Sequence, residues 1–148
     1  MKFALIAFCS LLLLLFSILL FLIQQSKTPP ELGLVDGQFS DCIYASNCVN
    51  SMAQGKAAIA PIPLSEQGWE KLPRVIRRMG GELVQQDGHY LRATFRTPML
   101  GFVDDMELLW VRENALLQVR ASSRVGRSDF AANRKRVEAL REHLLLMH

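Results

Sequence analysis

The sequence predicts an α+β protein: an N-terminal transmembrane helix, then one domain built as a roughly four-stranded antiparallel sheet packed with two helices. Three observations support this prediction. An uninterrupted apolar run opens the chain, four strand-like segments follow one another within residues 82–122, and apolar stripes at helical spacing lie before and after them. The connections between the four segments are too short for crossovers, so neighbouring strands should be antiparallel.

The first 23 residues are predicted to be a signal anchor. The run from Phe3 to Ile23 carries no charge, and a helix of this length crosses the roughly 30 Å hydrocarbon core of a bilayer. A cleaved signal sequence has a shorter apolar region and a small-x-small cleavage site, which residues 24–27 do not offer. Two positive charges precede the span, against Lys27 after it, and this favours a cytoplasmic N-terminus. We therefore expect the domain on the periplasmic side of a bacterial inner membrane.

Residues 24–41 are predicted to be a linker, because they contain two prolines and two glycines and show no sustained periodicity. A single exported domain, residues 42–148, would follow. Its two cysteines, Cys42 and Cys48, are expected to form a disulfide, since an even count in an exported region indicates pairing. The three histidines are isolated in the sequence, so no zinc site is predicted, and we expect no metal and no cofactor.

The first part of the domain is predicted to be extended and then helical. Residues 57–64, "AAIAPIPL", contain two prolines, which suits an edge segment. Ser65 is the expected N-cap of a helix whose apolar positions recur at helical spacing. Gly80-Gly81 should end this helix, and Pro73 should either kink it or lie in its first turn.

Four strands and a final helix are predicted next. The strands are expected at 82–86, 89–96, 101–112 and 115–122, with Asp87-Gly88 forming a hairpin between the first two. Ser128 is the expected N-cap of the last helix, with Asp129 in its first turn. The apolar stripe of this helix comprises Val137, Leu140, Leu144 and Met147.

Three carboxylates in "DDME" are the first candidate site. Strand alternation places Asp105 and Glu107 on one face of the sheet and Asp104 on the other. Asp105 and Glu107, with Cα atoms about 6.5 to 7 Å apart, could form an acid/base pair or contribute oxygen ligands to a metal. Alternatively, they pair with Arg92, Arg120 or Arg124 across the sheet. Both interpretations stay open at this point.

The stretch "SRVGRSDFAANRKR", residues 123–136, is the second candidate site. It contains five basic residues and leads into the last helix. A helix N-terminus beside Arg124, Arg127 and Arg134 would suit a phosphate or carboxylate. Asp129 already complements the helix dipole, however, and Asn133 could brace the loop, so the same stretch could be a salt-bridged structural corner.

Charge is unevenly distributed along the chain. The net charge is +3, and residues 120–148 alone carry seven basic and three acidic side chains. Such a basic segment attracts nucleic acid, anionic lipid or an acidic polymer. Export argues against nucleic acid, so an anionic lipid or another envelope ligand is the expected partner. Protein partners are not predicted.

The motifs resemble the family called domain of unknown function 1499, found in bacterial envelopes and in plastids. The resemblance runs from Cys42 to the C-terminus and rests on "NCV", a tryptophan-bearing helix, "GFVDD" followed by Glu107, and the arginine-rich stretch. It implies a family pattern at these positions: Cys42, Asn47, Cys48, Trp69, Tyr90, Asp104, Asp105, Glu107, Arg120, Ser123, Arg124, Gly126, Asp129, Asn133 and Arg134. Ser46 replaces the family's usual proline and Ala131 its usual glycine.

The function predicted from these features is a membrane-anchored envelope module that binds a ligand or has a structural role. The alternative is a small hydrolase or metal-assisted enzyme using Asp105 and Glu107. Catalysis is the less favoured of the two, because the sequence contains no Ser-His-Asp order, phosphate loop or nucleotide fingerprint.

Overall fold

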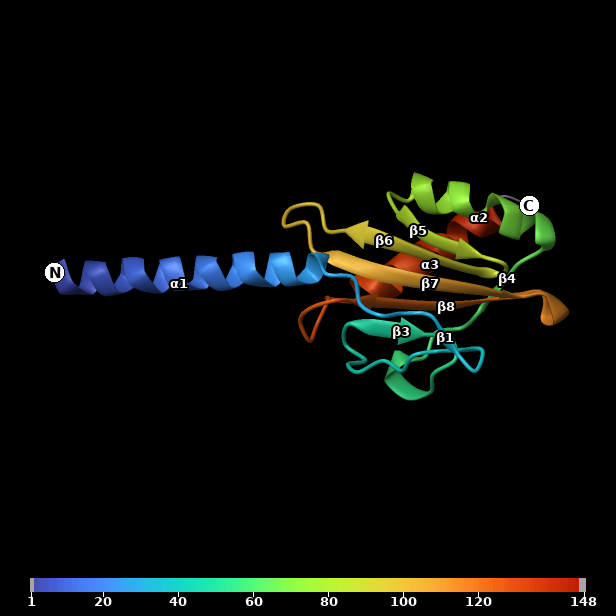
Figure 1. Cartoon of the computed structure of the whole chain (residues 1–148), viewed down its shortest axis with the longest axis horizontal. Helices are drawn as coiled ribbons and strands as arrows, with labels where there is room; N and C mark the ends of the chain where they lie inside the picture. The colour runs from blue at the N-terminus through green and yellow to red at the C-terminus, as the bar shows by residue number, and fades with distance from the viewer. Residues whose placement is uncertain (1, 147–148) are drawn as a thin grey trace.

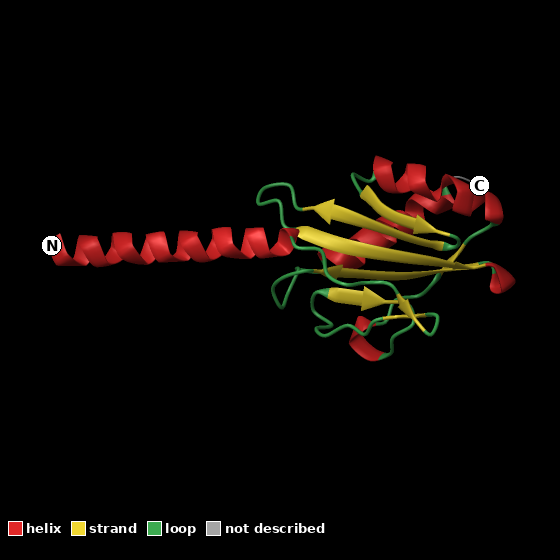
Figure 2. Cartoon of the chain, in the orientation of Figure 1, coloured by secondary structure: helices red, strands yellow, loops and turns green. Residues whose placement is uncertain are grey.

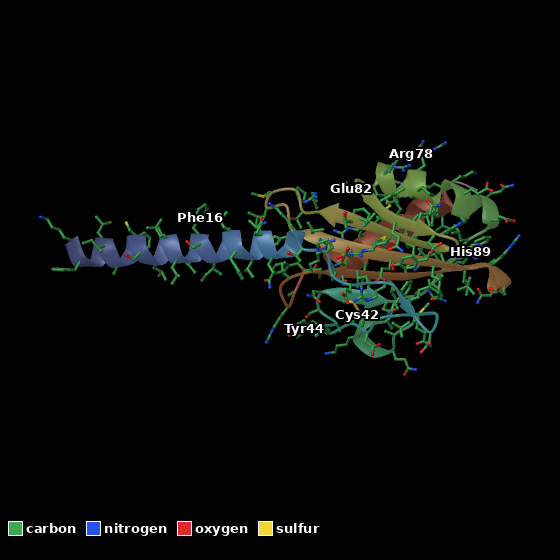
Figure 3. The ribbon with its side chains drawn as sticks, viewed as in Figure 1. Phe16, Cys42, Tyr44, Arg78, Glu82 and His89 are labelled. Atoms are coloured by element: carbon green, nitrogen blue, oxygen red, sulfur yellow. A yellow bond between two sulfur atoms is a disulfide. The ribbon has the colours of Figure 1, made fainter. Side chains whose placement is uncertain are left out.

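The computed structural model describes residues 2–146 and has the predicted α+β architecture, with a larger sheet than expected. Helix α1 (Lys2–Lys27) projects away from the domain (Figure 1). Its apolar side chains are exposed, as at the labelled Phe16 (Figure 3). It is the one helix among residues 2–146 that is long and apolar enough to cross a membrane, a property shared by anchors and signal sequences. It ends just before two prolines, which disfavour helical geometry in the residue ahead of them.

The segment expected to be a linker, residues 24–41, contains regular structure. Helix α1 continues four residues beyond the apolar run, and a hairpin of β1 (Leu34–Val35) and β2 (Gln38–Phe39) follows. The turn residues Asp36 and Gly37 both have positive φ, 51° and 75°, as a tight two-residue hairpin turn requires. Phe39 is buried, so the hairpin is attached to the domain by apolar contact.

The main sheet is antiparallel throughout and has six strands. Its strand order is β3-β8-β7-β6-β5, and β4 also pairs with β8 (Figure 2). The strands are β3 (Cys48–Asn50), β4 (Ile62–Pro63), β5 (Glu82–Asp87), β6 (Tyr90–Arg96), β7 (Val103–Val111) and β8 (Leu116–Ser123). Strands β5 to β8 are the four predicted ones. The two extra strands are only two or three residues long, too short for the alternating pattern that reveals a strand. Short 3-10 helices occupy Gly55–Ala57 and Arg112–Asn114.

Helix α2 (Glu66–Arg78) begins as predicted, with the Ser65 hydroxyl accepting a hydrogen bond from the Gly68 amide. Pro73 lies in the interior of this helix, so the first-turn alternative is wrong. The predicted Ser128 cap is also wrong, because helix α3 (Ala132–Leu145) begins four residues later. Phe130 and Ala131 have positive φ values. These left-handed conformations interrupt helical geometry between Ser128 and the first residue of α3. Met147 lies outside the described residues.

One face of the sheet forms the apolar core under α2 and α3. The core contains alternate residues of the central strands, such as Leu91, Met106 and Val119, each fully buried. Trp69 of α2 stacks on Trp110 of β7, with ring centroids 6.1 Å apart. The chain that follows α1 crosses the opposite face of the sheet on its way to β1 (Figure 1), and that second face carries charged side chains.

Candidate functional site

The second face of the sheet holds a buried polar network. Arg92 of β6, Asp105 and Glu107 of β7 and Arg120 of β8 are each at most 7% exposed. Their positions follow from strand register, since Arg92, Glu107 and Arg120 lie opposite one another on three neighbouring strands. Strand alternation therefore predicted the shared face of Asp105 and Glu107 correctly.

Asp105 is held by two arginines. Arg92 donates from Nε (3.2 Å) and Nη2 (2.9 Å) to Oδ1. Arg124, just past the end of β8, donates from Nε to Oδ2 (2.6 Å) and from Nη2 to Oδ1 (2.9 Å). Both carboxylate oxygens are thus bound, and the predicted pairing of Asp105 with arginines is confirmed.

Glu107 is held by Arg120 and Tyr90. Arg120 Nη1 donates to Oε2 at 2.8 Å, and the Tyr90 hydroxyl donates to Oε1 at 2.9 Å. Burial raises the pKa of Tyr90 well above its ordinary value, and the neighbouring Glu107 charge raises it further. Tyr90 is therefore a neutral hydrogen-bond donor to a carboxylate across the physiological range.

Arg124 also joins the sheet to α1. Its Nη1 donates to the carbonyl oxygens of Ser26 (3.1 Å) and Lys27 (3.2 Å). Ser26 is fully buried, and its hydroxyl accepts a hydrogen bond from the Val103 amide. A helix C-terminus leaves carbonyl oxygens without intrahelical donors, so Arg124 binds both the C-terminal end of α1 and the acidic strand β7.

The network has an excess of positive charge. Three arginines (Arg92, Arg120 and Arg124) share two carboxylates, which leaves one positive charge without a counter-charge within the network. Arg120 is the member with unused donors. Its Nη1 binds Glu107 and the Ser122 hydroxyl, but its Nε is buried with no partner, and no bond from its Nη2 is found within residues 2–146. A buried donor without a partner is rare and costly.

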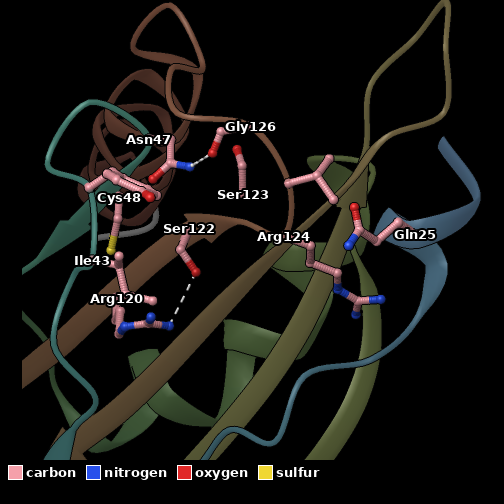
Figure 4. A pocket seen from close by; sticks show the side chains of 11 residues that line it. Gln25, Ile43, Asn47, Cys48, Arg120, Ser122, Ser123, Arg124 and Gly126 are labelled. Carbon is pink, nitrogen blue, oxygen red and sulfur yellow. Dashed lines mark hydrogen bonds between the residues drawn. The ribbon is translucent and has the colours of Figure 1, made fainter. Parts of the chain in front are cut away.

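Arg120 also lines a pocket of about 310 Å³. The pocket is open between Gln25 at the end of α1, the disulfide loop and the start of the arginine-rich stretch (Figure 4). Cys42 and Cys48 form the predicted disulfide in that loop, with Cα atoms 5.6 Å apart. The pocket is lined by Gln25, Ile43, Tyr44, Asn47, Cys48, Arg120, Ser122, Ser123, Arg124, Val125 and Gly126, none of them acidic. The lining therefore presents hydrogen-bond donors and positive charge without a competing carboxylate.

The predicted corner around the last helix is a separate polar cluster. Asp104 lies on the face opposite Asp105 and Glu107, as predicted, and its Oδ2 accepts a hydrogen bond from Arg136 Nη2 of α3 at 2.9 Å. Asn133 is fully buried, and its side-chain amide donates to the Asn47 carbonyl and the Ser123 hydroxyl. Asp129 accepts from the Asn133 amide, so its own carboxylate occupies the N-terminus of α3. Asn133 braces the loops, as predicted.

The arginines of the stretch do not converge on that helix end. Arg134 donates to the carbonyl oxygens of Lys56 and Ala58, and Arg127 lies over the Tyr44 ring, with its guanidinium carbon 5.4 Å from the centroid. Because Arg124 binds Asp105, the expected anion site at the start of α3 is not assembled. The sequence reasoning missed Arg136 and Ser122 as members of these networks. Ser122 lies directly opposite Asp105 on the neighbouring strand, and pairing the two predicted strands in this register would have identified it.

The structure also shows what Ser46 and Ala131, the two departures from the family pattern, do in this chain. The Ser46 hydroxyl donates to the Arg127 carbonyl, and the Ser46 carbonyl accepts from the Asp129 amide. Ala131 has φ of 63°, a left-handed conformation that favours glycine. A backbone requirement thus accounts for the glycine that the resemblance led us to expect at this position.

The alternative based on Asp105 and Glu107 finds no support in the geometry. Each carboxylate has both oxygens hydrogen-bonded and is at most 1% exposed. Within residues 2–146, no group of three or more histidine, cysteine or acidic side chains is placed to hold a metal ion. Neither carboxylate offers a free oxygen to a substrate or a cation.

Comparison with known families gives one match. Residues 38–144 match the family described as protein of unknown function (DUF1499). No curated protein and no solved structure matches the chain. The matched range includes the disulfide, the whole main sheet and nearly all of α3. The chain therefore belongs to the DUF1499 family.

Proposed function

We propose that this protein is a membrane-anchored binding module whose domain lies on the periplasmic side of a bacterial inner membrane and binds an anionic group in the Arg120 pocket. The observation that carries the proposal is Arg120, which lines an acid-free pocket and has a buried Nε without a hydrogen-bond partner. Nε and Nη2 form the edge of a guanidinium that grips a carboxylate or phosphate through two parallel bonds.

Charge balance supports the same ligand class. The buried network carries one positive charge more than its carboxylates neutralise. A bound monoanion would neutralise the network and satisfy Arg120 Nε in a single step. Buried charges in proteins are normally paired, so an anion is the ligand that removes both unfavourable features together.

The anchoring part of the proposal rests on α1 and on the disulfide. The helix has the length and apolar composition of a membrane span, and disulfides form and persist outside the cytoplasm. A reporter that is active only outside the cytoplasm, fused after the last residue, should be active and remain in the membrane fraction. Release of a shortened soluble form would instead show that α1 is a cleaved signal.

Anion binding is tested by titrating the full chain, in phosphatidylcholine nanodiscs, with inorganic phosphate and separately with acetate. The readout is the NMR signal of the Arg120 Nε–H group, which should shift on saturation with one or both anions. Arg120→Lys keeps the charge but loses the two-bond edge. It should weaken binding roughly tenfold, the effect of losing one charge-assisted hydrogen bond. Because this variant lacks the guanidinium, its binding is followed through the backbone amide signals of Ser122 and Ser123, which line the same pocket.

A second variant separates binding from folding. Ile43 lines the pocket and is 86% exposed, so Ile43→Glu places a negative charge at the pocket without disturbing the core. Val35 is 70% exposed and lines neither pocket, which makes Val35→Glu the matched control. The proposal predicts weaker anion binding for Ile43→Glu alone. Equal binding by both variants and the parent chain would contradict it.

A further inference from the structure

A second pocket lies on the other side of the segment that walls the Arg120 pocket. It has a volume of about 610 Å³ and is mainly apolar. Its walls are the β6–β7 loop around Met99 and the loop before α3 around Phe130, and Leu22 of α1 also lines it. Ser123, Val125 and Gly126 line both pockets. The charged pocket and the apolar groove are therefore neighbours that share one wall.

The two pockets contact α1 at successive levels. Leu22, which lines the groove, belongs to the apolar run of the helix, whereas Gln25, which lines the charged pocket, lies just beyond that run. Three residues along a helix span about 4.5 Å. When α1 spans a bilayer, the groove therefore lies on the hydrocarbon side and the charged pocket on the headgroup side of the same helix end.

The rim of the groove is unusually apolar for a protein surface. Met99 is 94% exposed and Phe130 is 90% exposed. Phe130 also has φ of 53°, a strained conformation for a bulky residue. Contact with lipid at the level of Leu22 would remove both apolar side chains from water.

We propose that the ligand of this protein is an anionic membrane lipid, with its charged headgroup in the Arg120 pocket and one acyl chain in the adjacent groove. This inference rests on the proposed function, because it names the class of molecule that brings the anion. The order of the two pockets along α1 matches the order of headgroup and chain in a bilayer. Both volumes fall in the roughly 300–1,000 Å³ range of ligand pockets.

The test uses the full chain in phosphatidylcholine nanodiscs containing a trace of phospholipid with a photoreactive diazirine at the end of one acyl chain. The probe is either phosphatidylglycerol, which is anionic, or phosphatidylcholine, which is zwitterionic. Cross-linked peptides are mapped by mass spectrometry. Phe16, halfway along α1 and exposed, is contacted by any surrounding lipid, so labelling around it serves as the internal reference.

The expected result is that phosphatidylglycerol labels residues 97–102 and 125–130 roughly tenfold more than phosphatidylcholine, relative to the reference. Both headgroups carry a phosphate, but the choline cation would add a positive charge beside a network that already has one in excess. Phe130→Asn should reduce this labelling several-fold. It should leave the fold intact, because asparagine tolerates positive φ. Val84→Ser, at a residue that is 52% exposed and lines neither pocket, is the matched control and should change nothing.

Two results would overturn the inference, and they are distinguishable from failure of the proposed function. Equal labelling by the two lipids shows that the groove does not take an anionic lipid. Absence of lipid labelling at residues 97–102 and 125–130, with labelling around Phe16 intact, shows that no acyl chain enters the groove. In either case, an Arg120-dependent response to inorganic phosphate or acetate would leave anion binding in place, with a free anion as the ligand. Loss of that response as well would remove both proposals.

Discussion

Replacing Asp105 with asparagine should strongly destabilise the domain. Asp105 is 1% exposed and accepts four hydrogen bonds from Arg92 and Arg124. Asp105→Asn keeps the shape of the side chain but removes its charge, so the network goes from one to two positive charges without a counter-charge. Breaking a buried ion pair by removing one partner costs about 3 to 5 kcal/mol. At roughly 4 °C per kcal/mol for a domain of this size, the melting temperature should fall by about 12 to 20 °C.

The fluorescence of Trp69 and Trp110 reports this unfolding, because both rings stack in the core and the chain has no other tryptophan. The matched control is Arg112→Gln. Arg112 pairs with Glu66 at 3.0 Å, close to the 2.9 Å between Arg92 and Asp105, but both side chains of the control pair are 60% exposed. Exposed pairs contribute about 0 to 1 kcal/mol, so the control should shift the melting temperature by no more than about 4 °C.

A double variant tests the charge argument itself. Asp105→Asn combined with Arg124→Gln removes one buried cation and returns the network to one excess positive charge. The double variant should therefore be more stable than Asp105→Asn alone, even though it contains one more substitution. If Asp105→Asn shifts the midpoint no more than Arg112→Gln, or if the second substitution adds its full cost, then excess buried charge is not what destabilises the domain.

Three further predictions concern Arg124, Tyr90 and the disulfide. Arg124→Ala should lower the melting temperature by several degrees, whereas exposed Arg127→Ala should leave it nearly unchanged; equal shifts would show that Arg124 is not a structural tie. Folding raises the pKa of Tyr90 above its ordinary value of 10.0. The stability that the protonated hydroxyl contributes is therefore complete below pH 10 and is lost as the pH rises above 10. The free energy of unfolding should fall by up to about 1.4 kcal/mol per pH unit in that range. Urea unfolding at pH 9 and pH 11 should show a smaller loss for Tyr90→Phe than for the parent chain. Non-reducing peptide mapping of the exported protein should find Cys42 linked to Cys48, and free thiols at both would contradict the predicted compartment.

Several local features were readable from the sequence because neighbouring residues determine them. The apolar run of α1 predicts a helix that cannot be buried in so small a domain. The Ser65 cap and the strands from Glu82 onward were predictable because capping and strand alternation depend only on local spacing. Alternation also placed Asp105 and Glu107 together, with Asp104 on the opposite face.

Tertiary structure alone decided how the charges are used. The sequence offered several arginines as partners for the acidic strand, and register determined that Arg120 faces Glu107 while Arg92 reaches Asp105 diagonally. The start of α3 was mispredicted because Phe130 and Ala131 adopt left-handed conformations that their side chains do not favour. Such geometry persists only when long-range contacts, such as those of Asn133 with Asn47 and Ser123, impose it.

The Arg120 pocket is the clearest case of a feature beyond the reach of the sequence. It brings together Gln25, Ile43 and Arg120 from three distant segments of the chain. Whether an arginine keeps a free edge depends on how many acceptors the fold places around it. That number follows from strand register and loop packing, which no local pattern of residues encodes. The sequence determined that the chain has an apolar anchor-like helix and an arginine-rich domain, and the tertiary structure determined which of its arginines still has donors to offer.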